Sequence, residues 1–346
     1  MADTPRSASR RRRAPGPCHA PGTRPAARAG VVGAMVVLLV TALAACTSSG
    51  TGKPGGPAPG SPAAAGTAGG HGGTKSPAGG TGVTHLDGRY VALGDSFTAS
   101  PLTHQQGGTP AVGCLRSAQD YPALVAAALR PASFVNVSCF GASTTDMTHR
   151  QRAAGELQPP QLSALSAADS LVTVQVGGDD IGVGRIVTTC AALSLTSPSG
   201  DPCRQHYTAG GTDQLARAVT QTAPKVASVL EAIRQRAPHA RVLLVGYPQI
   251  LPASGNGCWP EVAVSRGDVP YLRGIETQLN TALAAAAAAH GVTFVNTYEA
   301  SAGHDACQRP GVKWVEGLIP TSLAVPFHPN ALGEQAMARE VVAAAR

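Results

Sequence analysis

The stretch Tyr90-Val91-Ala92-Leu93-Gly94-Asp95-Ser96-Phe97 decides the fold of this chain. Its first four residues are apolar or aromatic, and the Gly-Asp-Ser that follows is typical of a sharp turn. The pattern predicts a buried strand that ends in a turn, with the Ser96 hydroxyl at the start of a helix. Ligands of an open parallel sheet bind just beyond the carboxyl ends of its strands. Ser96 is therefore a candidate nucleophile, although the same tripeptide also suits an ordinary turn serine that caps a helix.

Further short, Val-rich apolar runs repeat this pattern along the chain. The predicted strands are Arg89–Leu93, Ser133–Cys139, Leu171–Val176, Arg241–Gly246 and Thr293–Asn296. The predicted helices are Tyr121–Leu129, Asp213–Arg236, Pro270–His290 and Asn330–Ala345. Alternating strands and helices favour a three-layer α/β/α sandwich around a parallel sheet of about five strands.

Long irregular pieces follow the carboxyl end of each predicted strand, on the rim that builds the site in this fold. They are Ser100–Asp120, Thr144–Ser163, Thr188–Gly211, Gln249–Asp268 and Ala300–Phe327.

The net charge of +7 lies outside the predicted domain. Residues 1–30 carry +6 and the region around Lys53 and Lys75 carries +2, which leaves residues 85–346 near neutral. No basic patch interleaved with aromatic residues occurs, so the sequence argues against a nucleic-acid partner.

Residues 1–46 predict an export signal. A basic region precedes the apolar run 31–40, which is too short to span a membrane comfortably. The segment ends on Leu43-Ala44-Ala45-Cys46, which resembles the lipobox of bacterial lipoproteins. That resemblance implies that Cys46 is lipidated and anchors the protein to the outer face of the cell membrane. The alternative is a plain secretory signal cleaved near Ala45, with a secreted product.

Residues 47–84 contain Gly, Pro, Ala, Ser and Thr and almost nothing to bury. This composition predicts a disordered tether with a root-mean-square reach of roughly 30–40 Å. The folded domain is expected to occupy residues 85–346.

Six cysteines follow Cys46, and they lie in or beside the predicted loops: Cys114, Cys139, Cys190, Cys203, Cys258 and Cys307. An even number of cysteines in an exported domain predicts disulfides, for which 15 connectivities are open. Sequential pairing is the simplest of these. No Cys-x-x-Cys pair occurs, which argues against a zinc site.

Three further stretches at strand ends or loops carry unusual sequence. They are Ser138-Cys139-Phe140-Gly141-Ala142, Gly177-Gly178-Asp179-Asp180 and Pro326-Phe327-His328-Pro329-Asn330. Together with Gly94-Asp95-Ser96, over residues 88–340, they resemble the SGNH hydrolases, also called GDSL esterases and lipases. The second block and the six cysteines look most like the secreted actinobacterial lipase and esterase branch.

The resemblance implies a flavodoxin-like SGNH fold and the disulfides Cys114–Cys139, Cys190–Cys203 and Cys258–Cys307. It also implies acyl transfer to Ser96, with His328 as the general base and no metal or cofactor. The backbone N–H groups of Ser96 and Gly141 would donate to the oxyanion.

Two positions depart from the family pattern. An Asn whose amide donates to the oxyanion is expected where this chain has Asp179, and an ionised carboxylate donates nothing. Asp179 can take that place in the oxyanion hole if it is protonated, as a buried carboxylic acid can be. The alternatives are that its side chain turns away or that the enzyme is slow. The family often has an Asp three residues before the histidine, where this chain has Val325. The resemblance to the actinobacterial branch, where a backbone carbonyl can hold the imidazole N–H of a Ser–His dyad, implies this role for the Val325 carbonyl. Asp305 and Glu316 of the preceding loop are the alternatives, but spacing gives neither of them support.

The sequence thus favours a monomeric serine ester hydrolase of the cell surface, acting on a lipid or a small acyl ester. One alternative is an O-acetyl esterase that acts on cell-wall or other polysaccharide. An alternative of another class is a binding protein on the same scaffold, in which Asp179 marks weakened catalysis.

Overall fold

The computed structural model describes residues 85–103 and 112–346. A five-stranded sheet lies at its centre, with all neighbouring strands parallel and the order β2-β1-β5-β6-β7. The strands are β1 (Arg89–Gly94), β2 (Ser133–Asn136), β5 (Asp169–Gln175), β6 (Arg241–Val245) and β7 (Thr293–Val295). The predicted parallel sheet and α/β class are confirmed.

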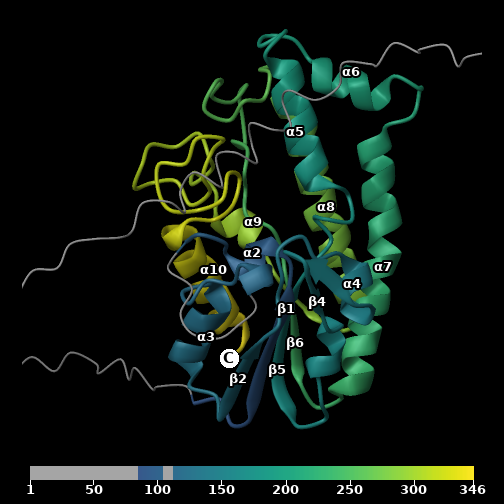
Figure 1. Cartoon of the computed structure of the whole chain (residues 1–346), viewed down its shortest axis with the longest axis vertical. Helices are drawn as coiled ribbons and strands as arrows, with labels where there is room; N and C mark the ends of the chain where they lie inside the picture. Colours follow the sequence, from purple (N-terminus) through teal and green to yellow (C-terminus); the bar gives the residue numbers. More distant parts are fainter. Residues whose placement is uncertain (1–84, 104–111) are drawn as a thin grey trace, which may run out of the picture. The chain divides into compact units, whose positions relative to one another are not determined.

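Helices cover both faces of the sheet (Figure 1). The long ones are α3 (Tyr121–Leu129) and α10 (Ala331–Ala344) on one face, and α7 (Gln214–Arg236) and α8 (Val269–Ala289) on the other. Their bounds agree with the predicted helices to within one residue at each end.

Side chains of β1 alternate between the two cores, as the period of a strand requires. Tyr90 and Ala92 pack with α3 and α10, whereas Val91 and Leu93 pack with α7 and α8. All four are fully buried. This two-sided burial explains why the strand reads as a continuous apolar run rather than an alternating one.

The strand order places the topological switch point between β1 and β5. The chain leaves β1 for β2 on one side and then crosses to β5 on the other side. In open α/β sheets, ligands bind where the order reverses in this way. The segments after β1 and β5, which contain Ser96 and Asp179, therefore flank this switch point.

The prediction that 188–211 is irregular was wrong. Helix α5 (Val183–Ser194) continues into this segment, and α6 (Pro202–Thr208) follows it. A disulfide between Cys190 and Cys203 joins the two helices, and Asp268 accepts hydrogen bonds from two backbone N–H groups at the start of α6. These tertiary contacts stabilise helices that are too short to stand alone.

Short elements also lie in or beside the other predicted loops. They are α2 (Ser96–Ala99), η2 (Val112–Cys114), α4 (Thr144–Thr148), the hairpin strands β3 (Gln151–Ala153) and β4 (Glu156–Gln158), η3 (Gln161–Ala164) and α9 (Thr297–Ala300).

The six cysteines pair as Cys114–Cys139, Cys190–Cys203 and Cys258–Cys307, the pairing that the family resemblance implied. The predicted signal, Cys46 and the tether lie outside the described residues. Among the helices that are described, none combines the length and the apolar character needed to cross a membrane.

Candidate active site

Ser96 is the first residue of α2, directly after β1, and it is 5% exposed. Asp95 caps this short helix, because its carboxylate accepts a hydrogen bond from the Phe97 backbone N–H at 2.9 Å. The turn needs Gly94, since a Cβ there would lie 2.7 Å or less from Thr98 side-chain atoms and 2.9 Å from the Gln175 carbonyl oxygen. The predicted strand-turn-helix geometry at Gly-Asp-Ser thus has a steric cause.

Two buried glutamines, which the sequence analysis missed, hold this turn in place. The Gln161 amide exchanges two hydrogen bonds of 2.8 Å with the backbone of Gly94. Gln175, at the end of β5, accepts from Thr98 and donates to the Gly246 carbonyl at the end of β6. For Gln175, a polar residue at the end of an otherwise apolar strand was the available signal, whereas Gln161 lies in η3 and carried none.

His328 is brought to Ser96 from 232 residues away in the chain, with Nε2 2.8 Å from Ser96 Oγ. The other ring nitrogen, Nδ1, lies 2.9 Å from the carbonyl oxygen of Pro326. A carbonyl only accepts, so Nδ1 carries the proton and Nε2 is left to accept from the serine hydroxyl. This is the tautomer that a general base requires.

The expectation that the Val325 carbonyl holds the imidazole was wrong. That carbonyl accepts the backbone N–H of His328 at 3.1 Å, which closes a turn. Phe327 adopts a left-handed conformation with φ of 62°, so the chain reverses and the ring meets the carbonyl of Pro326 instead.

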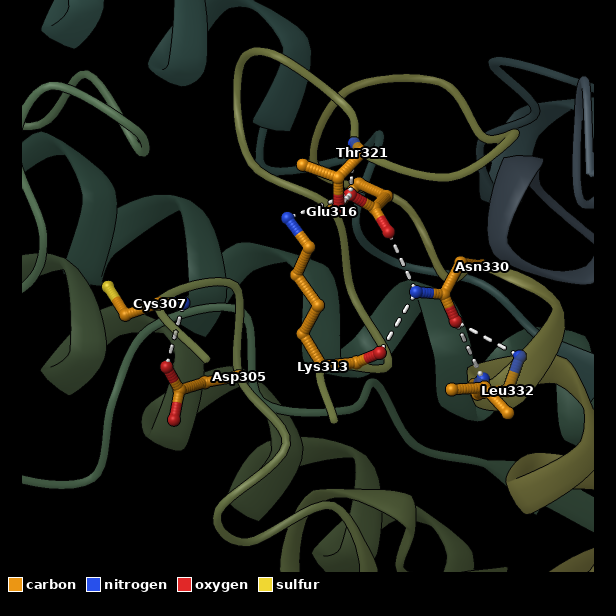
Figure 2. A network of polar contacts seen from close by, with 8 residues as sticks. Asp305, Cys307, Lys313, Glu316, Thr321, Asn330 and Leu332 are labelled. Atoms are coloured by element: carbon orange, nitrogen blue, oxygen red, sulfur yellow. Dashed lines mark hydrogen bonds and ion pairs between the residues drawn. The ribbon is translucent and has the colours of Figure 1, made fainter. Parts of the chain in front are cut away.

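A buried polar network stabilises the loop that carries His328 (Figure 2). Glu316 is fully buried; it pairs with Lys313 at 2.9 Å and accepts a hydrogen bond from the Asn330 amide at 2.8 Å. Its backbone N–H donates to the His328 carbonyl at 3.0 Å, and its carbonyl accepts from Phe327 at 3.1 Å. Glu316 therefore positions the histidine loop through the backbone.

Neither acidic residue of the preceding loop contacts the imidazole. The Glu316 carboxylate accepts from Lys313, Thr321 and Asn330, and Asp305 accepts from the Cys307 backbone N–H (Figure 2). Asp305 also accepts from the Gln308 side chain. The imidazole is thus held by a neutral carbonyl rather than by a carboxylate.

The surroundings of His328 disfavour its charged form. The rings of Phe97 and Phe140 lie 4.9 Å and 6.0 Å from the imidazole, centroid to centroid. Burial lowers the pKa of His328 to about 4, and the hydrogen bond to Pro326 only partly opposes this shift. At neutral pH the ring is an uncharged base.

Gly141 follows β2 in a left-handed conformation, with φ of 74°, that suits glycine. The disulfide Cys114–Cys139 lies just before it, and the intervening Phe140 N–H donates to the Cys114 carbonyl at 3.1 Å. Among the described residues, no acceptor pairs with the backbone N–H of Gly141 or of Ser96. Both groups remain available to an oxyanion.

Asp179 lies half-buried in the loop after β5. Burial and the neighbouring charges of Asp180 and Asp146 raise its pKa to about 6, and no hydrogen bond from another described residue offsets them. By contrast, Asp180 accepts from the backbone and hydroxyl of Thr144. The two adjacent carboxyls therefore differ, and only that of Asp179 is left without a protein donor in the described part of the chain.

Across residues 85–103 and 112–346, no group of three or more His, Cys, Asp or Glu side chains is arranged to hold a metal ion. The expectation that the reaction needs neither metal nor cofactor stays a prediction.

This chain is similar in sequence and in fold to known proteins. The GDSL-like Lipase/Acylhydrolase family matches residues 92–336. Lipase 2 of Streptomyces coelicolor is 38% identical over 260 residues, which cover 73% of this chain and 84% of the relative.

Two solved structures from the same genus are also similar. Phospholipase A1 from Streptomyces albidoflavus NA297 has a TM-score of 0.59 and 29% identity, over 74% of this chain and 98% of the other. The extracellular lipase from Streptomyces rimosus has a TM-score of 0.60 and 27% identity, over 75% of this chain and 100% of the other. From the family match, the similarity to Lipase 2 and the shared fold, we conclude that this chain belongs to the GDSL-like lipase/acylhydrolase family and is a carboxylic ester hydrolase.

Proposed function

We propose that Ser96 is the nucleophile and His328 the general base of this ester hydrolase. The observation that carries the proposal is the 2.8 Å contact between Ser96 Oγ and His328 Nε2, with Nδ1 directed to the Pro326 carbonyl. A nucleophile, a base and a group that orients the base are the parts that acyl transfer through serine requires. Because one chain supplies all of them, we propose that the protein works as a monomer.

The reaction proceeds in two halves. His328 Nε2 takes the hydroxyl proton as Ser96 Oγ attacks the ester carbonyl carbon, and it then returns that proton to the leaving alkoxide. In the second half, His328 takes a proton from water, which attacks the acyl-serine. The collapse of the second tetrahedral intermediate returns the proton to Ser96 and releases the carboxylic acid.

The oxyanion is proposed to accept hydrogen bonds from the Ser96 and Gly141 backbone N–H groups and from a protonated Asp179. An ionised Asp179 about 4 Å from the oxyanion would cost up to ~4 kcal/mol at an effective dielectric near 20. A carboxylic acid kept neutral by its surroundings can instead donate. The raised pKa of Asp179, about 6, supports this assignment.

The substrate is proposed to be a lipid or another apolar acyl ester. Residues 317–327, which lead into His328, contain no charged residue. In this segment Ile319 and Leu323 are 76% and 71% exposed. Exposed apolar side chains in the segment that leads into the base favour an apolar ester over an acetylated polysaccharide. The names of two relatives, a lipase and a phospholipase A1, point the same way.

Covalent labelling tests the catalytic residues. A fluorophosphonate is expected to label the wild-type protein at Ser96, and neither Ser96→Ala nor His328→Ala should react at a comparable rate. Ser143→Ala, which changes another serine of the strand-end loops, serves as the control and should label normally. A folded wild-type protein that is not labelled would contradict the proposal and favour a binding protein on this scaffold.

Hydrolysis of p-nitrophenyl esters of increasing acyl length tests the substrate. Activity that persists or rises beyond acetate is expected for an apolar ester. Activity confined to acetate would favour the O-acetyl esterase.

We also propose that the protein is exported and held at the outer face of the cell membrane by a lipid on Cys46, with residues 47–84 as the tether. The extracellular lipase among its relatives supports export. Cys46→Ser should move the activity from the membrane fraction to the medium. Activity that is in the medium for both proteins would instead indicate a plain secretory signal.

A further inference from the structure

Tyr247, two residues beyond β6, joins the two loops that flank the active site. Its hydroxyl accepts a hydrogen bond from the Gly178 backbone N–H at 2.9 Å and donates one to the Asp95 carboxylate. Gly178 immediately precedes Asp179, and Asp95 immediately precedes Ser96. One buried hydroxyl therefore connects the neighbours of the nucleophile and of the proposed oxyanion donor.

The surrounding structure is built to hold that hydroxyl. Tyr247 is 5% exposed, its backbone N–H donates to the Asn280 side chain at 2.9 Å, and the Phe97 ring packs edge-on against it at 5.1 Å. A Cβ on Gly178 would lie only 3.2 Å from the Tyr247 hydroxyl oxygen. Glycine at 178 thus lets the phenol approach the backbone.

The environment of the Tyr247 phenol makes it a hydrogen-bond donor to Asp95. Burial and the nearby Asp95 raise the pKa of Tyr247, so its hydroxyl keeps its proton and stays a donor. Asp95 has a second donor, the Phe97 N–H. The result is a short chain of hydrogen bonds from the loop after β5, through Tyr247, to the helix that begins at Ser96.

We propose that Tyr247 is a positioning residue that fixes the loop of Gly178 and Asp179 relative to Ser96 and so sets the distance between nucleophile and oxyanion donor. The inference rests on the proposed roles of Ser96 and Asp179. Tyr247 itself does not touch the reacting atoms. Its effect is on the geometry of the transition state, where a displacement of about 1 Å can cost on the order of 10²-fold in rate.

Tyr247→Phe tests this because it keeps the ring and removes only the hydroxyl. With a soluble short-chain p-nitrophenyl ester, kcat should fall by roughly 10- to 100-fold with little change in KM, since substrate binding is not altered. The rate of fluorophosphonate labelling of Ser96 should fall in parallel.

Tyr90→Phe is the matched control. Tyr90 is also a buried tyrosine, and it packs in the core formed with α3 and α10, where its hydroxyl lies 2.9 Å from Thr173 Oγ1. Both variants should lose a similar amount of thermal stability, but only Tyr247→Phe should lose kcat. Equal kcat in the two variants at equal folded fraction would overturn the inference.

A double-mutant cycle tests the link to position 179. Asp179→Ala removes the donor that Tyr247 is proposed to position, so Tyr247→Phe should cost less kcat in that background than in the wild type. The same fold-loss in both backgrounds would overturn the inference. If the wild-type protein is not labelled at Ser96, the proposed function itself fails, which is a separate result.

Discussion

At the scale of single residues, the proposed mechanism depends on two titrating groups with opposite requirements. His328 must be neutral to take the Ser96 proton, and burial lowers its pKa to about 4. Asp179 must be protonated to donate to the oxyanion, and burial with neighbouring carboxylates raises its pKa to about 6. Both requirements are met together only at a pH between these two pKa values.

The pH dependence of kcat/KM should therefore be bell-shaped in the wild type. Activity should rise through about pH 4 as His328 loses its proton, and it should fall through about pH 6 as Asp179 ionises. In Asp179→Asn the amide donates at every pH, so the alkaline limb should disappear while the acid limb stays. Rates of ester hydrolysis from pH 3 to 9 measure both.

Asp180→Asn provides a comparison, because the alkaline limb of its pH profile should shift rather than disappear. Removing the neighbouring charge lowers the pKa of Asp179, which should move the alkaline limb to lower pH. If Asp179→Asn is inactive while still folded, the protonated donor is excluded.

Gly141→Ala isolates the backbone donor. A Cβ would meet nothing within 4 Å, but φ of 74° is unfavourable for alanine by about 1–2 kcal/mol. The loop should shift, and kcat should fall by on the order of 10²-fold if the N–H donates to the oxyanion.

Gly155→Ala is the control for backbone strain alone. Gly155 has φ of 87° in the β3–β4 turn, again with open space around it. Its thermal unfolding should change as much as that of Gly141→Ala, with kcat retained. A loss of kcat in both variants would argue against a special role for Gly141.

At the scale of secondary-structure elements, the disulfides hold loops of different importance. Cys114–Cys139 lies next to Phe140 and Gly141, whereas Cys190–Cys203 joins α5 to α6. The long strands and helices were predicted closely because their apolar periodicity is local. Helices α5 and α6 were missed in part because tertiary contacts stabilise them.

Removing each disulfide should separate stability from activity. Cys114→Ala/Cys139→Ala and Cys190→Ala/Cys203→Ala should each lower the free energy of unfolding by about 3 kcal/mol. Only the first pair should also lower kcat, because it frees the loop that carries the Gly141 N–H. Urea unfolding and ester hydrolysis measured on the same preparations make the comparison, and equal kcat in both would refute it.

At the scale of the whole molecule, buried carboxyl groups link stability to pH. Burial raises the pKa of Asp120 and of Glu276 to about 8, far above their ordinary values near 4. In the folded protein these groups hold protons that the unfolded chain has already released. Their contribution to the stability of the folded protein is present at acid pH and is lost as the pH rises through about 8.

The melting temperature should therefore fall between pH 6.5 and pH 8.5. Below pH 6.5 the lowered pKa of His328 makes the folded state more stable as the pH rises, which opposes the effect of the carboxyl groups. The range from pH 6.5 to 8.5 therefore isolates the carboxyl groups from His328. Glu276→Gln keeps an acceptor for the Ile250 N–H and removes one ionisable group. The melting temperature of this variant should therefore fall less steeply with pH than that of the wild type. A melting temperature that is constant across the window in the wild type would contradict the prediction.

The sequence by itself determined the sheet and the family, and it made Ser96 the candidate nucleophile. Val-rich runs that end in Gly-Asp-Ser and in Gly-Gly-Asp-Asp encode strands and turns locally, so Ser96 and Asp179 could be placed on one rim. His328 was found because the order of the motifs resembles a known family. The strand and turn signals depend on residues that are close together in the chain, whereas His328 was found only from motifs spread over residues 88–340.

Tertiary structure alone decided how those residues are held. Pro326 rather than Val325 accepts from the imidazole because the chain reverses at Phe327. Glu316 supports the histidine loop, and Tyr247 joins two strand ends, through contacts with partners that no periodicity encodes. Buried polar groups must find hydrogen-bond partners wherever the fold brings them, so their pairing follows from the packed chain and not from local sequence.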